Sequence, residues 1–305
     1  MTAVTQETMS KELNADGLAS DETRERWMVL GLCGPALFLI GIVMVVPVAW
    51  LFWLSAVGAD GTLSMENYER LWQSKSYARI FLTTFQVAFV TTGICMLIGY
   101  PLTYMMAQLP RRAANIAMIC VLLPFWTSLL VRTYAWLVLL QRKGLVNTWL
   151  IDAGIIDTPL RLVHNFTGNI IGMSQIMLPF LILPLYASMR AIDQDFVKAA
   201  ANLGAGPFNA FWRGFLPLSL PGLFAGMLLV FVLSLGFFVT PVVLGGGRII
   251  MVAMRIEKSI SLYSNWGAAS ALAVVLLIMT LACLAVAAKL LKLDKSQSSS
   301  GGTEG

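Results

Sequence analysis

The stretch that decides the fold is DQDFVKAAANLGAGPFNAFWRGFLPLSLP, from Asp193 to Pro221, which lies between two apolar stretches of membrane length. Asp193 can cap a helix, Asp195 falls in the first turn of that helix, and Gly204 suits the position just past its end. The pattern therefore predicts one short helix from Asp193 to Gly204. One face of it carries small and apolar side chains at helical spacing: Phe196, Ala199, Ala200 and Leu203.

The second half of this stretch predicts another helix. Gly206-Pro207 breaks the first helix, and Pro207 is suited to the first position of the next one. We expect Leu216-Pro217 to end this second helix. Its aromatic side chains are Phe208, Phe211, Trp212 and Phe215. Together the two halves predict a helix-turn-helix element that lies flat at a membrane surface.

Composition independently indicates a membrane protein. Hydrophobic residues make up 58% of the 305 residues and charged residues 12%, against roughly 45–50% and about 25% in soluble domains. A spanning helix needs about 20 apolar residues. Six stretches without Asp, Glu, Lys or Arg qualify or nearly do: Val29–Trp53, Phe81–Ala107, Ala113–Val131, Phe166–Met189, Leu218–Leu244 and Gly267–Ala288. We therefore expect an all-α membrane protein with six transmembrane helices.

The domain organisation follows from these stretches. We expect a polar N-terminal tail over 1–28, one membrane domain over 29–288 and a C-terminal tail over 289–305, with SQSSSGGTEG disordered. The first apolar stretch is longer than the roughly 7–15 residues of a signal-peptide core, so we interpret it as a retained span. A cleaved signal peptide is the alternative, because Ala56-Val57-Gly58 is a small-residue site.

An even number of spans places both termini on the same side of the membrane. Lys and Arg divide almost evenly between the two sides, but those close to helix ends carry the orientation signal. The turn Leu109-Pro110-Arg111-Arg112 and the basic end from Lys289 to Lys295 predict cytoplasmic termini and a cytoplasmic loop over 190–217. The net charge of +5 then reflects membrane topology, and we expect no nucleic-acid partner.

Several kinds of chemistry are missing from the sequence. It contains no GxxxxGK[ST] phosphate loop, so we expect ATP to be bound elsewhere. The apolar stretches hold no ionisable relay, which argues against an ion-coupled carrier. His164, the only histidine, is expected in a solvated loop and not in a metal site. The cysteines lie in apolar stretches without CxxC spacing, which predicts buried free thiols.

The polar insert also carries a family signature. Lys198-Ala199-Ala200, Gly204 and Leu216-Pro217 are similar in spacing to the EAA loop of ABC-importer permeases. The sequence departs from that pattern at Lys198, where the family usually has Glu, and at Gly214, where it usually has Ile. The resemblance implies that this segment is a coupling helix that docks into a cleft of a separate ATPase subunit. An interfacial amphipathic helix without a partner is the alternative.

Other segments resemble spermidine/putrescine-type permeases over roughly Trp27 to Leu293: LPFWTSLLVRTYAW from Leu123, GLVN from Gly144, IDTPLRL from Ile156, LPF from Leu178, LPLY from Leu183, TPVVLGGG from Thr240 and NWGAA from Asn265. This resemblance implies a type I importer permease in a bacterial inner membrane. It also implies two permease subunits, of which a heterodimer is favoured, an external solute-binding protein, and two ATPase subunits that bind the ATP and Mg.

Residues near the outer ends of the spans are candidates for the translocation path or a gate. Arg132 is the first charge after the third stretch and can line the passage or snorkel to the interface. Pro241 and Gly245-Gly246-Gly247 suit an outer gate, a re-entrant turn or a plain loop. Aromatic side chains can offer cation–π contacts or form an interfacial belt: Trp50, Trp53, Trp126, Tyr134 and Trp136.

The expected function is a permease subunit of an ATP-driven importer. Pro179 and Pro184 are expected to kink the fourth span, which leads into the coupling loop. The expected solute is a polyamine, and the alternative is an opine, an amino-acid derivative or another small nitrogenous solute. Two rival classes are an ion-coupled secondary transporter and a membrane scaffold.

Overall fold

The computed structural model describes residues 2–58, 61–193 and 206–300, and it divides the chain into two units. The first unit, Met1–Leu54, is formed by helix α1 (Thr2–Ser55), whose apolar part from Gly31 to Ser55 is long enough to cross a membrane. This part corresponds to the first predicted span. The α1 helix begins well before that span and includes the segment predicted as a polar tail.

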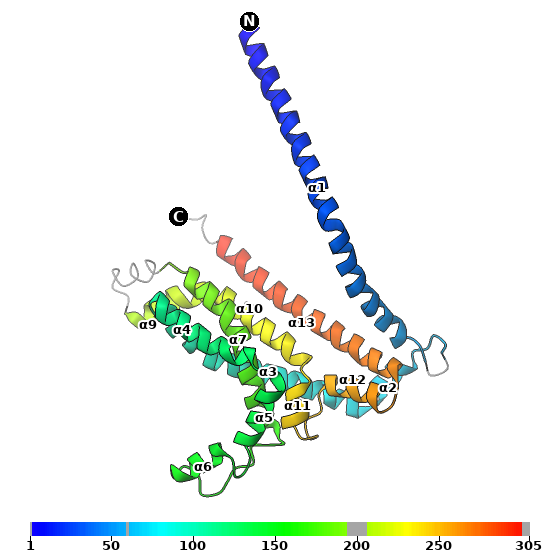
Figure 1. Ribbon diagram of the computed structural model, residues 1–305, viewed down its shortest axis with the longest axis vertical. Coiled ribbons are helices and arrows are strands. Elements are labelled where there is room, and N and C mark those ends of the chain that lie inside the picture. The colour runs from blue at the N-terminus through cyan, green and yellow to red at the C-terminus, as the bar shows by residue number, and fades with distance from the viewer. Residues whose placement is uncertain (1, 59–60, 194–205, 301–305) are drawn as a thin grey trace. The chain divides into compact units, whose positions relative to one another are not determined.

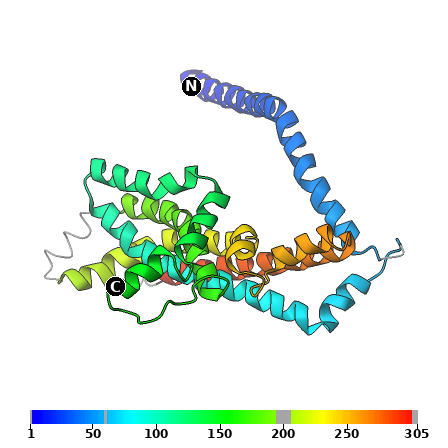
Figure 2. The same ribbon diagram turned by 60° about the horizontal axis from the view of Figure 1, so that its bottom comes forward.

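Three long helices form the core of the second unit, Ser55–Gly305. They are α3 (Lys75–Gln108), α7 (Phe166–Ala191) and α10 (Leu216–Leu235), and each contacts the other two. Figures 1 and 2 show these helices side by side. They contain most of the second, fourth and fifth predicted spans, so apolar length identified them correctly.

Glycines allow the three helices of this bundle to approach closely. A Cβ at Gly226 of α10 would lie 2.8 Å from the carbonyl oxygen of Leu181 in α7. A Cβ at Gly99 of α3 would lie 2.5 Å from a methyl group of the same leucine, and one at Gly222 would lie 2.2 Å from Ser188. Small residues at helix contacts are typical of membrane bundles, where packing and not the hydrophobic effect drives association.

The third predicted span, Ala113–Val131, is not one straight helix. Instead α4 (Arg111–Leu122) continues into a short 3₁₀ helix (Leu123–Trp126), and α5 (Leu129–Leu139) then leaves at an angle of 96°. Figure 1 shows α5 leaving the direction of α4. The break has a local cause: the Thr127 side chain and amide both donate to the Pro124 carbonyl, which ends the 3₁₀ turn.

The predicted fifth span, Leu218–Leu244, is also divided. Helix α10 ends at Leu235, with Gly236 as its C-cap, and α11 (Val239–Leu244) starts after a short connection. Glycine is a weak helix former, and Pro241 in the first turn of α11 has no N–H that would need a helical partner. Both properties favour ending one helix and beginning another here.

Described residues thus contain five helices long and apolar enough to span a membrane, or six if α4 and α5 together count as one span. The remaining helices are α2 (Glu66–Gln73), α6 (Leu145–Asp152), α9 (Pro207–Ala210), α12 (Val252–Ser261) and α13 (Trp266–Ser300). The last of these contains the sixth predicted span and continues beyond Ala288 into the segment for which a disordered tail was predicted.

Candidate coupling region and path

Most of the predicted coupling helix lies outside the described residues. This applies to Asp195, Phe196, Lys198, Ala199, Ala200, Leu203 and Gly204. Asp193 is described: it is exposed and follows the end of α7 after Ile192. The helix from Asp193 to Gly204 therefore stays a prediction, and only the two ends of the loop can be placed.

Downstream of the loop, the chain forms one long helix with a wide turn in it. Helix α9 begins at Pro207, as the sequence predicts, and is followed by a π-helix from Phe211 to Phe215 (η2) and then by α10. The prediction that Leu216-Pro217 ends the second helix is wrong, because Pro217 lies in the first turn of α10. Proline lacks an N–H and crowds the carbonyl four residues earlier, and a π turn widens the helix just before it.

An aromatic cluster joins this π turn to α3. The ring of Tyr104 lies edge-on to Phe211 at 5.2 Å and to Phe215 at 5.1 Å between centroids. Tyr100, one turn earlier, contacts Phe211 at 6.2 Å, and its hydroxyl lies 3.0 Å from the Ser219 Oγ. Edge-to-face pairs of this kind contribute about 0.5–1.5 kcal/mol beyond the area that they bury.

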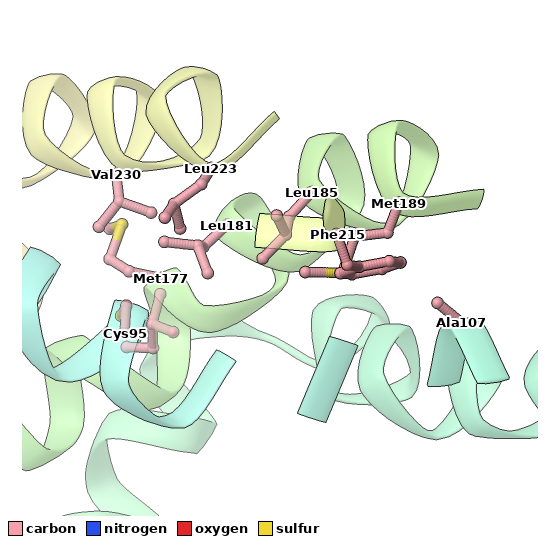
Figure 3. Packing of buried hydrophobic residues seen from close by; sticks show 10 residues of the cluster. Cys95, Ala107, Met177, Leu181, Leu185, Met189, Phe215, Leu223 and Val230 are labelled. Atoms are coloured by element: carbon pink, nitrogen blue, oxygen red, sulfur yellow. The ribbon is translucent and has the colours of Figure 1, made fainter. Parts of the chain in front are cut away.

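Upstream of the loop, α7 is also joined to α3. Arg190, in the last turn of α7, donates a hydrogen bond from Nη1 to the carbonyl oxygen of Ala107, at 3.1 Å. That carbonyl belongs to the last turn of α3, whose final carbonyls have no partner within the helix. Figure 3 shows Met189 and Phe215 next to each other, with Ala107 opposite them. Both ends of the loop thus meet the same end of α3.

Sequence reasoning missed Tyr104 and Arg190. A signal was available, since Tyr100 and Tyr104 are four residues apart and share one helix face. The partner of that face was not recognisable, because Phe211 lies more than 100 positions away in the chain. No pattern in the sequence singles out Arg190.

The candidate path residues are spread over two elements that touch. Arg132, Tyr134 and Trp136 lie on α5, and Pro241 lies on α11, which contacts both α5 and α7. Tyr134 is exposed, whereas Trp136 is half-buried and donates from Nε1 to the Gln175 side chain of α7 at 3.3 Å. Each of these residues remains a candidate for the path.

Arg132 is only partly exposed. It is half-buried, and its Nε and Nη1 atoms are buried without a hydrogen-bond partner among the described residues. A buried guanidinium nitrogen without a partner is costly. A hydrogen-bond partner for these two nitrogens would stabilise Arg132 in this position.

The three glycines after α11 form a tight turn. Gly245 caps α11, and Gly246 and Gly247 have φ angles of +57° and +76°, in the region that favours glycine. A Cβ at Gly246 would lie 2.4 Å from Nδ1 of His164, so this turn packs directly on the loop before α7. An outer gate, a re-entrant turn and a plain loop remain the possible roles of these glycines.

Outside the spans, Arg255 of α12 occupies an aromatic site. Its guanidinium lies 5.6 Å from the ring centre of Tyr77 and 5.5 Å from that of Tyr263, and Nη2 lies 3.4 Å from the Tyr77 hydroxyl. These contacts raise the pKa of Arg255, chiefly through the hydrogen bond to Tyr77. Within the described ranges, no three His, Cys, Asp or Glu side chains gather where they could hold a metal ion.

Comparison with known proteins decides the family. Residues 99–293 match the family described as the inner membrane component of binding-protein-dependent transport systems. The chain belongs to this family. It is therefore a multi-pass inner membrane protein and a transport subunit of a binding-protein-dependent ABC system.

Relatives of this permease include two spermidine/putrescine transport system permease proteins named PotB. The protein from Haemophilus influenzae is 37% identical over 217 residues, which cover 71% of this chain and 76% of the relative. The protein from Escherichia coli is 31% identical over 253 residues, which cover 83% of this chain and 90% of the relative.

A solved structure confirms the fold. The permease resembles a chain in the crystal structure of a bacterial alginate ABC transporter in complex with an alginate pentasaccharide-bound periplasmic protein, with a TM-score of 0.67. Identity is 17%, and the match covers 88% of this chain and 94% of the other. At this identity the match speaks for the fold alone. The predicted ABC-importer permease fold is confirmed.

Proposed function

We propose that this permease forms the translocation path of an ATP-driven polyamine importer. The observation that carries the proposal is the 37% identity to a spermidine/putrescine permease over 71% of the chain. The chemistry of the chain is compatible with it. A polyamine is a flexible polycation, and aromatic faces and neutral hydroxyl or carbonyl oxygens can bind ammonium groups without a fixed carboxylate.

The proposed assembly holds this chain, a second homologous permease, two ATPase subunits and an external solute-binding protein. ATP and Mg are bound by the ATPases. Both termini and the 190–217 loop face the cytoplasm, so the loop can meet the ATPases. Closure of the ATPases would move the loop, and the spans on either side of it would carry the motion to the outer gate near Pro241 and Gly245-Gly246-Gly247.

The decisive experiment is uptake by the whole complex in proteoliposomes. The complex of this permease with its partners is expected to accumulate labelled putrescine or spermidine when ATP and the binding protein are present. An opine and a basic amino acid serve as alternative solutes. Accumulation of one of these in place of polyamines would reassign the substrate within the same machinery.

The same vesicles separate the rival classes. Uptake that persists without the ATPases but disappears with the ion gradient would identify a secondary transporter. A fully assembled complex that moves no solute would leave a scaffold role.

The coupling role of the loop has its own test. Deletion of residues 196–203 is expected to abolish ATP-dependent uptake while the permease still inserts into the membrane. Unchanged uptake would remove the loop from the coupling mechanism. Lys198→Glu, which restores the usual family charge, is expected to weaken coupling if an acidic group of the ATPase faces Lys198. Equal coupling would mean that the loop is recognised by its shape.

A further inference from the structure

The two ends of the coupling loop are fixed to the C-terminal end of α3 by different chemistry. At the upstream end, a charged donor on Arg190 binds the Ala107 carbonyl at 3.1 Å. Charge-assisted hydrogen bonds are roughly twice as strong as neutral ones. The bond also uses a carbonyl that the helix itself leaves without a partner. Removal of Arg190 would therefore leave only the hydrophobic packing between α7 and α3 just before the loop.

At the downstream end, the connection is aromatic. Tyr104 contacts both Phe211 and Phe215, the first and last residues of the π turn, at centroid distances of 5.2 and 5.1 Å. The two phenylalanines are themselves stacked, with 18° between their planes. The Tyr104 ring thus packs against both ends of the π turn. Phe215 is buried in the same cluster as Ala107 and Met189, so the two connections share one core.

The C-terminal end of α3 leads directly to the segment of α4 and α5, which is the broken third span. After Gln108, the chain turns at Leu109-Pro110 and enters α4, which is followed by the 96° break and α5. Helix α5 contacts α11, which carries Pro241. Besides the direct route along α7 and α10, a second route therefore leads from the two ends of the loop through α3 and, along the chain, through α4 and α5 to the candidate path. π turns are frequent at functional sites in helices.

We propose that the last two turns of α3, from Tyr100 to Ala107, receive the motion of the coupling loop, and that Tyr104 and Arg190 are the positioning residues that transmit it. This inference rests on the proposed function, because it assumes that the loop is moved by an ATPase. It adds the element that responds and the two side chains that join it to the loop. Neither side chain is proposed to touch the solute.

The test measures coupling and not activity alone. Tyr104→Leu removes the ring and keeps an apolar side chain, and Arg190→Gln removes the charge. The conservative variants are Tyr104→Phe and Arg190→Lys. Two controls match them: Tyr186→Leu, a half-buried tyrosine on α7, and Arg112→Gln, an exposed arginine on α4. Among the described residues, Tyr186 makes no ring contact and Arg112 no hydrogen bond at the loop ends.

Each variant complex, in proteoliposomes with the binding protein, is assayed for solute taken up per ATP hydrolysed. Tyr104→Leu and Arg190→Gln are expected to lower this ratio at least about fivefold. That factor is the lower end of the coupling factors usual between two sites of a protein. ATP hydrolysis should stay within about twofold of the wild type, because the ATPase sites are intact. The conservative variants and both controls should keep the wild-type ratio.

An unchanged ratio in both variants, or a parallel fall of uptake and hydrolysis in a normally assembled complex, would overturn the proposal. If Tyr104→Leu fails to assemble, Arg190→Gln decides, because Arg190 is exposed and its replacement empties no core. The wild-type complex tests the proposed function separately. Absence of polyamine uptake there would reject the proposed substrate, whereas the present inference fails only through the variants measured against the wild type.

Discussion

Two apolar regions of this permease contain prolines, but the helices stay continuous in one region and are broken in the other. The bundle of α3, α7 and α10 keeps its helices continuous across Pro101, Pro179, Pro184 and Pro221. The segment from α4 to α5 breaks by 96° between Trp126 and Leu129, just after the 3₁₀ helix that contains Pro124. Both regions have the length and apolar character of a membrane span, so a proline by itself does not decide whether a span bends.

The two regions differ in how much of the helix packs against the rest of the chain. In α7, 56% of the most apolar window is buried within the chain, and Pro179 is buried. Around Pro124 the neighbours are exposed: Leu123 by 60%, Phe125 by 51% and Trp126 by 89%. Packing against two neighbouring helices can compensate a missing helical hydrogen bond, which costs about 3 kcal/mol in an isolated helix. Pro101 and Pro221 are themselves exposed in helices that stay continuous, so the packing of the whole helix in the bundle, and not the burial of the proline, accompanies continuity.

The largest effect is expected from a side chain placed inside the bundle. Gly226→Val would put a branched side chain 2.8 Å from the Leu181 carbonyl, where a rigid backbone cannot move away. We expect about 3 kcal/mol of destabilisation, the upper end of the usual cost of overpacking, and little folded complex in detergent. Gly93→Val on α3 is the matched control, since a Cβ there meets nothing within 4 Å. Equal yields and melting temperatures for the two variants would show that the bundle is not tightly packed at Gly226.

The next effect concerns the segment that follows α5. Asn147 of α6 is fully buried and makes three hydrogen bonds: its Nδ2 donates to the Gln141 and Leu160 carbonyls, both at 3.0 Å, and its Oδ1 accepts from the Leu160 amide at 2.8 Å. Asn147→Ala is expected to cost about 1–3 kcal/mol in all, because Gln141 and Leu160 are exposed and part of the freed backbone groups can reach solvent.

Because these bonds lie within one loop, the damage from Asn147→Ala should stay local. Hydrogen exchange over residues 141–165 should accelerate while exchange in α7 stays slow. Thr148→Val, which loses only the hydroxyl bond to Gly144 at 3.1 Å, should have a much smaller effect. Faster exchange throughout the bundle would mean that the two regions fold as one unit.

A smaller effect is expected at the break itself. Thr127→Val removes the hydroxyl that donates to the Pro124 carbonyl and leaves the backbone bond in place. Losing one such bond costs about 1 kcal/mol. The distribution of distances between spin labels on α4 and α5 should broaden without a change in folded yield. A distribution as narrow as the wild type would show that the surrounding contacts, and not this turn, hold the angle.

The last prediction needs no substitution. It concerns the accessibility of two native cysteine side chains. Cys95 lies in the bundle and is fully buried, whereas Cys120 on α4 is exposed. A membrane-permeant maleimide should label Cys120 in the folded permease and reach Cys95 only after denaturation. Rapid labelling of Cys95 would show that the bundle opens readily. Exposure of Cys33 and Cys120 also corrects the prediction that all four thiols are buried.

Apolar length and missing charge were sufficient to place most spans, because a membrane helix must satisfy its own backbone and present apolar side chains over about 20 residues. The same criterion failed wherever the backbone bends within an apolar stretch, as at Thr127 and Gly236. At Pro217 the prediction failed for the opposite reason: a residue that usually stops a helix was accommodated by a π turn.

The sequence by itself determined the class of this protein: its membrane composition, its helical spans and the spacing of its coupling loop are all local properties of the chain. Only the tertiary structure decided which residues join that loop to the rest of the permease. Tyr104 meets Phe211 and Arg190 meets Ala107 across long intervals of sequence. Such contacts depend on how α3, α7 and α10 pack together, and helical periodicity within one segment carries no information about its partner.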